Sequence, residues 1–224
     1  MSPGISAKFA SLGLVVLLAG CAATAPQYYS LQAPAMAAAP QAGEITADYV
    51  ISVQPVLIPE QLARPQIVVA AASGSEVMPL NAALWAGPLE AQIRDSLADS
   101  MARRLNVLDV GLSKVVELPT WRIYVDVQRF DSVYGEAVRH DVVWRLVPQN
   151  MPEDVGKRVC SAQLLHSVGT GMSALVEGHR RSLDTLAAVM AQTLPLGSTL
   201  PPLSEAQQEG LHFRGCVVQD AGQA

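Results

Sequence analysis

The side chains that most often carry out catalysis are few in this sequence and lie far apart along it. Gly111-Leu112-Ser113-Lys114-Val115 has the first glycine of a nucleophile elbow but lacks the second. Gly169-Thr170-Gly171-Met172 has no lysine to bind a phosphate group. The four histidines show no helical pair at the spacing of a metal site: His140, His166, His179 and His212. We therefore predict that the protein is not an enzyme and uses neither a metal nor an organic cofactor.

Two histidines and two aspartates need a structural interpretation instead. His140 and His179 fall on the apolar stripes of a predicted strand and a predicted helix, where a hydrogen-bonded core histidine is more common than a metal ligand. Asp126 and Asp141 lie on the two arms of a predicted hairpin. We expect them to form cross-strand charge pairs with the arginines of the same hairpin, which are Arg122, Arg139 and Arg145.

One cysteine near the N-terminus has a clear chemical role. Residues 9–17 are apolar or small, and Lys8 is the only side-chain charge ahead of them, which is the layout of a secretory signal peptide. The stretch then ends in Leu18-Ala19-Gly20-Cys21, which resembles the bacterial lipobox. Small residues fit the peptidase cleft, and only a cysteine thiol forms the thioether to a diacylglyceryl group. The alternative is a plain secreted protein with a chance cysteine beside its cleavage site.

The lipobox predicts how the protein is attached to a membrane. Residues 1–20 would be removed, Cys21 would carry acyl chains such as palmitate, and residues 21–26 would form a short tether. Several chains on one residue anchor a protein almost irreversibly. Ala22 follows the cysteine, and the absence of Asp at this position favours the outer membrane in enterobacterial sorting. No second long apolar run follows, so we expect a lipid-anchored body with no spanning helix.

The other two cysteines, Cys160 and Cys216, form an even pair in an oxidising compartment. We predict a disulfide between them that holds the C-terminal tail to the strand around Cys160, and two separate buried thiols are the alternative. The net charge is −5 without a basic cluster, which argues against nucleic acid and against electrostatic binding to anionic headgroups.

Hydrophobic periodicity predicts a single domain over residues 27–195, with an Ala/Pro-rich excursion at 33–47 and a loop-like tail at 196–224. Helices are expected over about 87–105 and 173–194, each with one apolar stripe. Residues 120–131 and 136–147 alternate around a short turn and predict an antiparallel hairpin, with a bulge near Phe130. Shorter strands are predicted at 27–31, 48–55, 66–71, 76–80, 157–167 and 211–218. The predicted fold class is α+β, a mostly antiparallel sheet of about six strands with two helices packed on one face.

Several of these pieces, in their order and spacing, resemble the auxiliary lipoprotein family of ABC-type, MCE-domain lipid transport systems, whose familiar member belongs to the paraquat-inducible system. The resemblance covers about residues 18–195 and includes the lipobox and the second helix. Its departures are the excursion at 33–47 and the tail that contains Cys216. The matching segments between the lipobox and that helix are Tyr28-Tyr29-Ser30-Leu31, Pro59, Leu62-Ala63-Arg64-Pro65-Gln66-Ile67-Val68, Ala83-Leu84-Trp85-Ala86-Gly87-Pro88-Leu89, Val125-Asp126-Val127-Gln128-Arg129-Phe130-Asp131 and Trp144.

The resemblance implies an outer-membrane lipoprotein that faces the periplasm and docks a tunnel-forming MCE protein connected to an inner-membrane transporter. It implies no catalysis and no cofactor. It leaves open a bound phospholipid and a homo-oligomer as further partners. Other classes also remain open, namely an outer-membrane assembly or scaffold lipoprotein and a stand-alone envelope-binding module. An adjacent MCE-domain gene with a permease and an ATPase would favour the first class.

Two loop segments are the candidate contact surface for such a partner, because they place apolar or aromatic side chains where packing does not obviously require them. Residues 62–68 contribute Leu62, Arg64 and Pro65, and residues 83–88 contribute Trp85. The alternative for Trp85 is that it caps the hydrophobic core.

Overall fold

The computed structural model describes residues 25–32, 47–71, 76–111, 113, 117–152, 155–194 and 200–219. The predictions for the signal peptide, the lipobox and Cys21 lie outside these residues, as does nearly all of the predicted excursion at 33–47. The described chain folds as one sheet with helices against it.

Three long strands form the centre of the sheet, and a fourth extends it. β5 (Thr120–Val133) and β6 (Ala137–Gln149) form the predicted antiparallel hairpin, with the bulge between Val127 and Arg129. β7 (Lys157–Ser167) pairs with β6 over the predicted range. β8 (Leu211–Gln219) pairs with β7 and forms one edge of the sheet. These strands alternate inward and outward side chains because a pleated strand has a period of two residues.

Four shorter strands complete the sheet and change its topology from the predicted one. They are β1 (Gln27–Tyr29), β2 (Val50–Val53), β3 (Gln66–Ala70) and β4 (Val77–Trp85). β1 runs parallel to β4, and β2 and β3 run parallel to β5, so the sheet is mixed. The predicted α+β class is confirmed and the longest pairings are antiparallel, but the strand number was wrong, because eight strands instead of about six join a single described sheet. The fourteen residues of β5 are long enough for β2 and β3 to pair along the same edge, one at each end.

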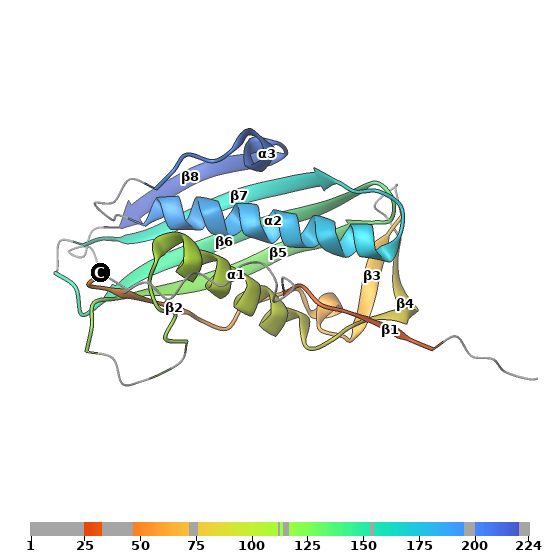
Figure 1. Cartoon of the computed structure of the whole chain (residues 1–224), viewed down its shortest axis with the longest axis horizontal. Helices are drawn as coiled ribbons and strands as arrows, with labels where there is room; N and C mark the ends of the chain where they lie inside the picture. The colour runs from red at the N-terminus through yellow and green to blue at the C-terminus, as the bar shows by residue number, and fades with distance from the viewer. Residues whose placement is uncertain are drawn as a thin grey trace, which may run out of the picture.

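Two long helices cover one face of the sheet, as predicted (Figure 1). α1 (Leu89–Leu105) and α2 (Met172–Thr193) bury their apolar stripes against it. Pro88 precedes the first turn of α1, and Asn106 ends the helix in a left-handed conformation. The tail also contains a short α-helix, α3 (Glu205–Gln208), which begins at a capping box on Ser204, so the prediction of a loop-like tail before β8 was wrong here.

The core lies between the sheet and the two helices. Its largest fully buried side chains include Trp121, Trp144 and Met101. All four residues of β2 are buried, although only one face was predicted to be. The side chains of Ser52 and Gln54 are also buried, and Gln54 Nε2 donates a hydrogen bond to Ser52 Oγ at 2.7 Å. This polar pair lets the other face of β2 be buried without unpaired groups.

Candidate functional site

The histidines that could have suggested catalysis lie inside the core. His140 on β6 and His179 on α2 are completely buried, and His140 Nε2 lies 2.8 Å from His179 Nδ1. Ser132 Oγ lies 2.8 Å from His179 Nε2, and Ser182 Oγ lies 2.9 Å from His140 Nδ1. The Phe130 ring stacks on both imidazoles. Each ring nitrogen therefore has a hydrogen-bond partner and none reaches solvent, which confirms the prediction of core histidines.

Burial also keeps this pair uncharged. Desolvation lowers the pKa of His179 to about 3. The pKa of His140 lies well below its usual value, mainly because of desolvation and, to a smaller extent, because of the neighbouring His179. His166 is buried at its δ nitrogen and its pKa is also lowered, mainly by burial. A neutral, enclosed chain of two serines and two histidines stabilises the packing of α2 on the sheet and offers no surface for a substrate.

The folded protein should lose stability as the pH falls from about 6.5. Because the folded-state pKa values of His140 and His179 are depressed, the unfolded chain binds more protons below pH 6.5. Between pH 6.5 and 5 the free energy of unfolding should fall by up to about 1.4 kcal/mol per pH unit for each histidine. Urea unfolding at several pH values measures this slope.

The exposed His212 provides the matched control for that measurement. A His212→Gln variant should reproduce the wild-type pH dependence, whereas His179→Gln should flatten it. A free energy of unfolding that stays constant or increases between pH 6.5 and 5 would contradict a buried neutral pair.

Among the described residues, no group of three or more His, Cys, Asp or Glu side chains could hold a metal ion. Within the same residues, no helix is both long enough and apolar enough to cross a bilayer.

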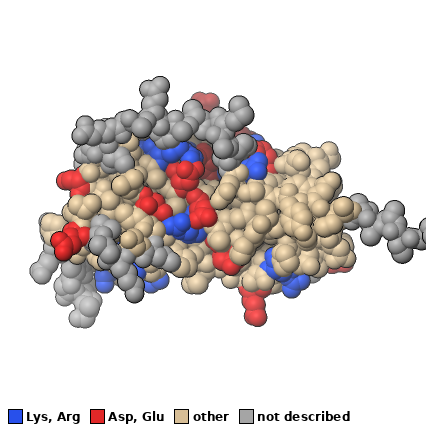
Figure 2. Space-filling view, turned by 60° about the horizontal axis from the view of Figure 1, so that its bottom comes forward, with Lys and Arg blue, Asp and Glu red and all other residues tan. Residues whose placement is uncertain are grey.

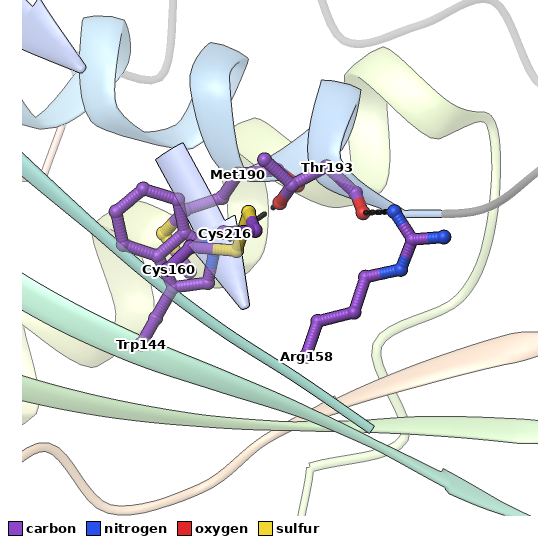
Figure 3. The surroundings of a disulfide bond; sticks show 6 residues. All are labelled: Trp144, Arg158, Cys160, Met190, Thr193 and Cys216. Carbon is purple, nitrogen blue, oxygen red and sulfur yellow. Dashed lines mark hydrogen bonds between the residues drawn. A yellow bond between two sulfur atoms is a disulfide. The ribbon is translucent and has the colours of Figure 1, made fainter. Parts of the chain in front are cut away.

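A disulfide links Cys160 on β7 to Cys216 on β8, where the two residues lie opposite each other in the ladder. Figure 3 shows it under the C-terminal turn of α2, beside Trp144 and Met190. Trp144 Nε1 donates to Thr193 Oγ1 at 3.2 Å, and Arg158 Nη1 donates to the Thr193 carbonyl at 3.4 Å. The bond thus joins the tail to the best-packed part of the domain.

The opposite face of the sheet carries no helix of the described chain. Its outward side chains are polar or half-buried, in contrast to the buried side under α1 and α2. We call this surface the open face. On β5 and β6 it consists of alternate residues, including Arg122, Tyr124, Asp126, Asp141 and Arg145. A sheet face without a covering helix is a surface available to another molecule.

A hollow of about 490 Å³ lies in the open face where β3 and β4 meet β5. Its apolar wall consists of Leu62, Val68, Val77 and Leu165. Its polar wall contains Arg129, Asp131 and Arg139. Arg129 Nε lies 3.6 Å from a carboxylate oxygen of Asp131 and 3.5 Å from one of Asp141. Burial raises the pKa of Asp131, and the two arginines oppose this effect.

The other end of the open face carries an arginine–tyrosine cluster. Tyr124 on β5 lies directly opposite Arg145 on β6. The guanidinium carbons of Arg122 and Arg145 lie 5.4 Å and 5.0 Å from the centre of the Tyr124 ring. Arg122 Nη2 also donates to Gln54 Oε1 at 2.9 Å, and neither arginine forms an ion pair with a described residue. Two arginines held by an aromatic ring present donors suited to carboxylates or phosphates.

The hairpin forms charge pairs, but with other partners than expected. Asp141 pairs across the strands with Arg129 and not with Arg122, Arg139 or Arg145, and Arg139 lies opposite Asp131 in the ladder. Asp126 lies opposite Val143, so its expected pairing with a hairpin arginine was wrong. The bulge predicted near Phe130 lies between Val127 and Arg129 and shifts the register by one residue, so the sequence indicated the bulge but not which residues it places opposite each other.

The four predicted contact residues are divided between surface and core. Leu62 lines the hollow, and Arg64 and Pro65 are exposed beside it. Trp85 lies at the end of β4 instead of in a loop, is 4% exposed, and packs edge-on against Phe130 and His179. Trp85 therefore takes the core role that the sequence had left as its alternative. The arginine–tyrosine cluster was not predicted from the sequence, although the alternation of the strands already placed Arg122, Tyr124 and Arg145 on the outward side.

The fold and this surface define a two-layer α+β domain with one open sheet face. A crystal structure of an uncharacterized protein matches it with a TM-score of 0.57 and 20% identity, covering 75% of this chain and 97% of that one. The structure of XCC0632 from Xanthomonas campestris, of the family DUF330, matches with a TM-score of 0.50 and 17% identity, covering 63% and 81% of the two chains. Likeness at this identity shows the fold alone. No curated protein matches the sequence.

The family model for the ABC-type transport auxiliary lipoprotein component matches residues 29–191. The chain belongs to this family, and the matched range confirms the family suggested by the sequence. The protein is thus an auxiliary component of ABC-type transport.

Proposed function

We propose that this protein is an outer-membrane lipoprotein, anchored by acyl chains on Cys21, that faces the periplasm and docks the MCE-domain protein of an intermembrane lipid transport system. Its role is to seat the end of a lipid path and so to support envelope integrity, without catalysis. The observation that carries the proposal is the family match over residues 29–191. Residues 27–195 act as the docking domain, and 196–224 form an appended tail.

The open face supports a docking role. Its strands are long and inflexible, and its outward side chains include arginines that make no ion pair with a described residue. Arg145 is exposed, and Arg122 is half-buried. At an interface, planar guanidinium groups supply directional hydrogen bonds to carboxylates, so the MCE protein would present acidic side chains here.

The hollow supports contact with lipid or with an apolar side chain of the partner. Apolar side chains line it beside Arg129 and Arg139, a combination that suits an acyl segment next to a phosphate, although the acidic Asp131 and Glu136 belong to the same lining. A phospholipid in the hollow would lie between the membrane and the partner.

The test is co-purification of the acylated protein with the MCE-domain protein encoded nearest to it. We expect Arg145→Glu to reduce recovery of the MCE protein by at least about tenfold, since reversing one interfacial charge commonly costs 2 kcal/mol or more. Arg103→Glu on α1 is the matched control, because Arg103 is exposed on the helix-covered side. Equal recovery of the MCE protein with both variants would remove the open face from the interface, and no recovery with the wild type would reject the proposed partner.

Gene neighbourhood and the same purification distinguish the alternatives. An assembly or scaffold lipoprotein would recover a β-barrel or another outer-membrane component. A stand-alone envelope-binding module would be recovered together with a polymer of the cell envelope and without a transporter.

A further inference from the structure

At one end of the molecule, three described segments contain no charged side chain. The segments contain β1, β3 and β4, and the nearest charges along the chain are Arg64 before β3 and Glu76 before β4. No Lys, Arg, Asp or Glu occurs in residues 25–32, 65–71 or 77–89. Figure 2 shows acidic and basic side chains interleaved over the helices and a broad uncharged surface toward the right of the view. We call this region the uncharged end.

The uncharged end exposes large apolar and aromatic side chains. Tyr28 is 66% exposed, Val77 60% and Met78 54%. Tyr134, in the turn between β5 and β6, is 51% exposed beside them, because Ala70 of β3 pairs with Val133. β1 covers only the last three residues of β4, so residues 77–82 of β4 form an uncharged edge. Pro79 limits strand pairing along this edge, but exposed apolar and aromatic side chains gathered on an uncharged surface still indicate a contact site.

The N-terminal attachment point lies at this same end. Ala25 lies two residues before β1 and is only four residues from Cys21, a distance that a fully extended chain spans in at most about 14 Å. The segment after β1 is fixed to the body, because Arg180 donates to the Ser30 carbonyl at 2.6 and 3.1 Å and Gln92 accepts from the Leu31 amide at 2.9 Å. A short tether on a fixed segment therefore holds the uncharged end next to the acyl chains.

We infer that the uncharged end lies against the lipid bilayer, with Tyr28, Val77, Met78 and Tyr134 in the headgroup region. The inference rests on the acyl anchor of the proposed function and adds a second, protein-made contact to it. Tyrosines favour the membrane interface because their rings are apolar and their hydroxyls stay hydrated. Glu76 and Glu136 flank the patch, so the contact favours zwitterionic over anionic headgroups.

This contact gives the protein a fixed orientation. Strand β5 runs from the arginine–tyrosine cluster to the uncharged end, and Tyr124 and Val133 are separated by about 30 Å along it at 3.3 Å per residue. The cluster thus points away from the membrane, as a periplasmic docking surface requires.

Spin labels measure the contact directly. With Cys21 acylated and Cys160 linked to Cys216, an introduced cysteine is the one free thiol, since the sequence has three cysteines. Labels at Met78→Cys and Tyr134→Cys are compared with Leu118→Cys, whose native side chain is 51% exposed near the start of β5, at the opposite end. The full acylated protein is reconstituted in phosphatidylethanolamine vesicles with a minor fraction of phosphatidylglycerol, without any partner protein.

We expect a several-fold lower collision rate with a water-soluble nickel chelate at Met78 and Tyr134 than at Leu118, and a higher collision rate with oxygen. A Val77→Asp change should restore access of the chelate to the label at Tyr134 while the protein stays on the vesicles. Equal access at all three sites overturns the inference. The inference is also overturned if the labels stay shielded from the chelate in detergent micelles and the shielding increases with protein concentration. That result would show that a second copy of the protein covers the uncharged end.

The outcome is separable from the proposed function. Mass spectrometry of the purified protein shows whether Cys21 is acylated, and failure there rejects the anchor itself. Failure of the labels with Cys21 acylated rejects only the contact of the uncharged end.

Discussion

A Cys21→Ser variant is expected to fold normally and to move from the membrane fraction to the soluble fraction almost completely. Each methylene group of an acyl chain buried in the bilayer contributes about 0.8 kcal/mol, and two or more chains make binding practically irreversible. The variant lacks the sulfur that forms the thioether, so it loses all of these contributions at once. The described part of the chain has no helix that could hold the protein in the membrane instead.

Cell fractionation with immunodetection, together with incorporation of labelled palmitate, checks this result. The Cys160→Ser/Cys216→Ser double variant is the matched control, because it also loses thiols and should remain acylated and on the membrane. Cys21→Ser protein that still sediments with outer membranes would contradict the acyl anchor. The uncharged end could retain a small fraction, and adding Val77→Asp to Cys21→Ser would then release it.

Removal of the Cys160–Cys216 disulfide should produce the second large effect. The bond closes a loop of 56 residues, for which chain entropy predicts about 4 kcal/mol of stabilisation, and measured values are usually 2–5 kcal/mol. A Cys160→Ala/Cys216→Ala double variant should therefore lose about 2–4 kcal/mol in urea unfolding. β8 should respond most, since it pairs only with β7 and most of its residues are exposed.

Hydrogen exchange locates the loss. In the double variant, the amides of β8 should exchange much faster, whereas those of β5 and β6 should change little. The single Cys216→Ala variant is the control for packing, because it keeps the buried Cys160 side chain. A gain of two hydrogens on reduction of the native protein shows that the bond is formed. Equal stability of the native protein and the double variant would show that the disulfide does not restrain the tail.

The local structure of this protein followed closely from its sequence. The predicted helix at 87–105 is α1 (Leu89–Leu105), and the predicted strand at 157–167 is β7. Both segments have strong periodicity and clear ends, such as Pro88, and their side chains pack on one side only. The burial of His140 and His179 was predictable for the same reason, because each occupies a position of an apolar stripe.

Pairings between distant segments could not be predicted in the same way. The parallel pairing of β2 with β5 and the strand position of Trp85 depend on contacts between residues far apart in the chain. The break in alternation near Phe130 indicated a bulge, but it did not give the residue that faces Asp126, which is Val143. Tertiary packing also decided that Trp85 points into the core instead of toward a partner.

The sequence by itself predicted the signal peptide and the lipobox at Cys21, and it indicated the family and the α+β class that the family match and the structure then confirmed, because each of these is encoded in neighbouring residues or in a short period. Only the tertiary structure decided which sheet face stays open and which side chains gather on it. Arg122 and Arg145 meet at Tyr124 across a hairpin, and three uncharged segments that are separate in the sequence form one end, where the described chain begins at residue 25. The physical reason is that a surface is made by strand pairing, and pairing is set by the burial of the whole core and not by any single segment.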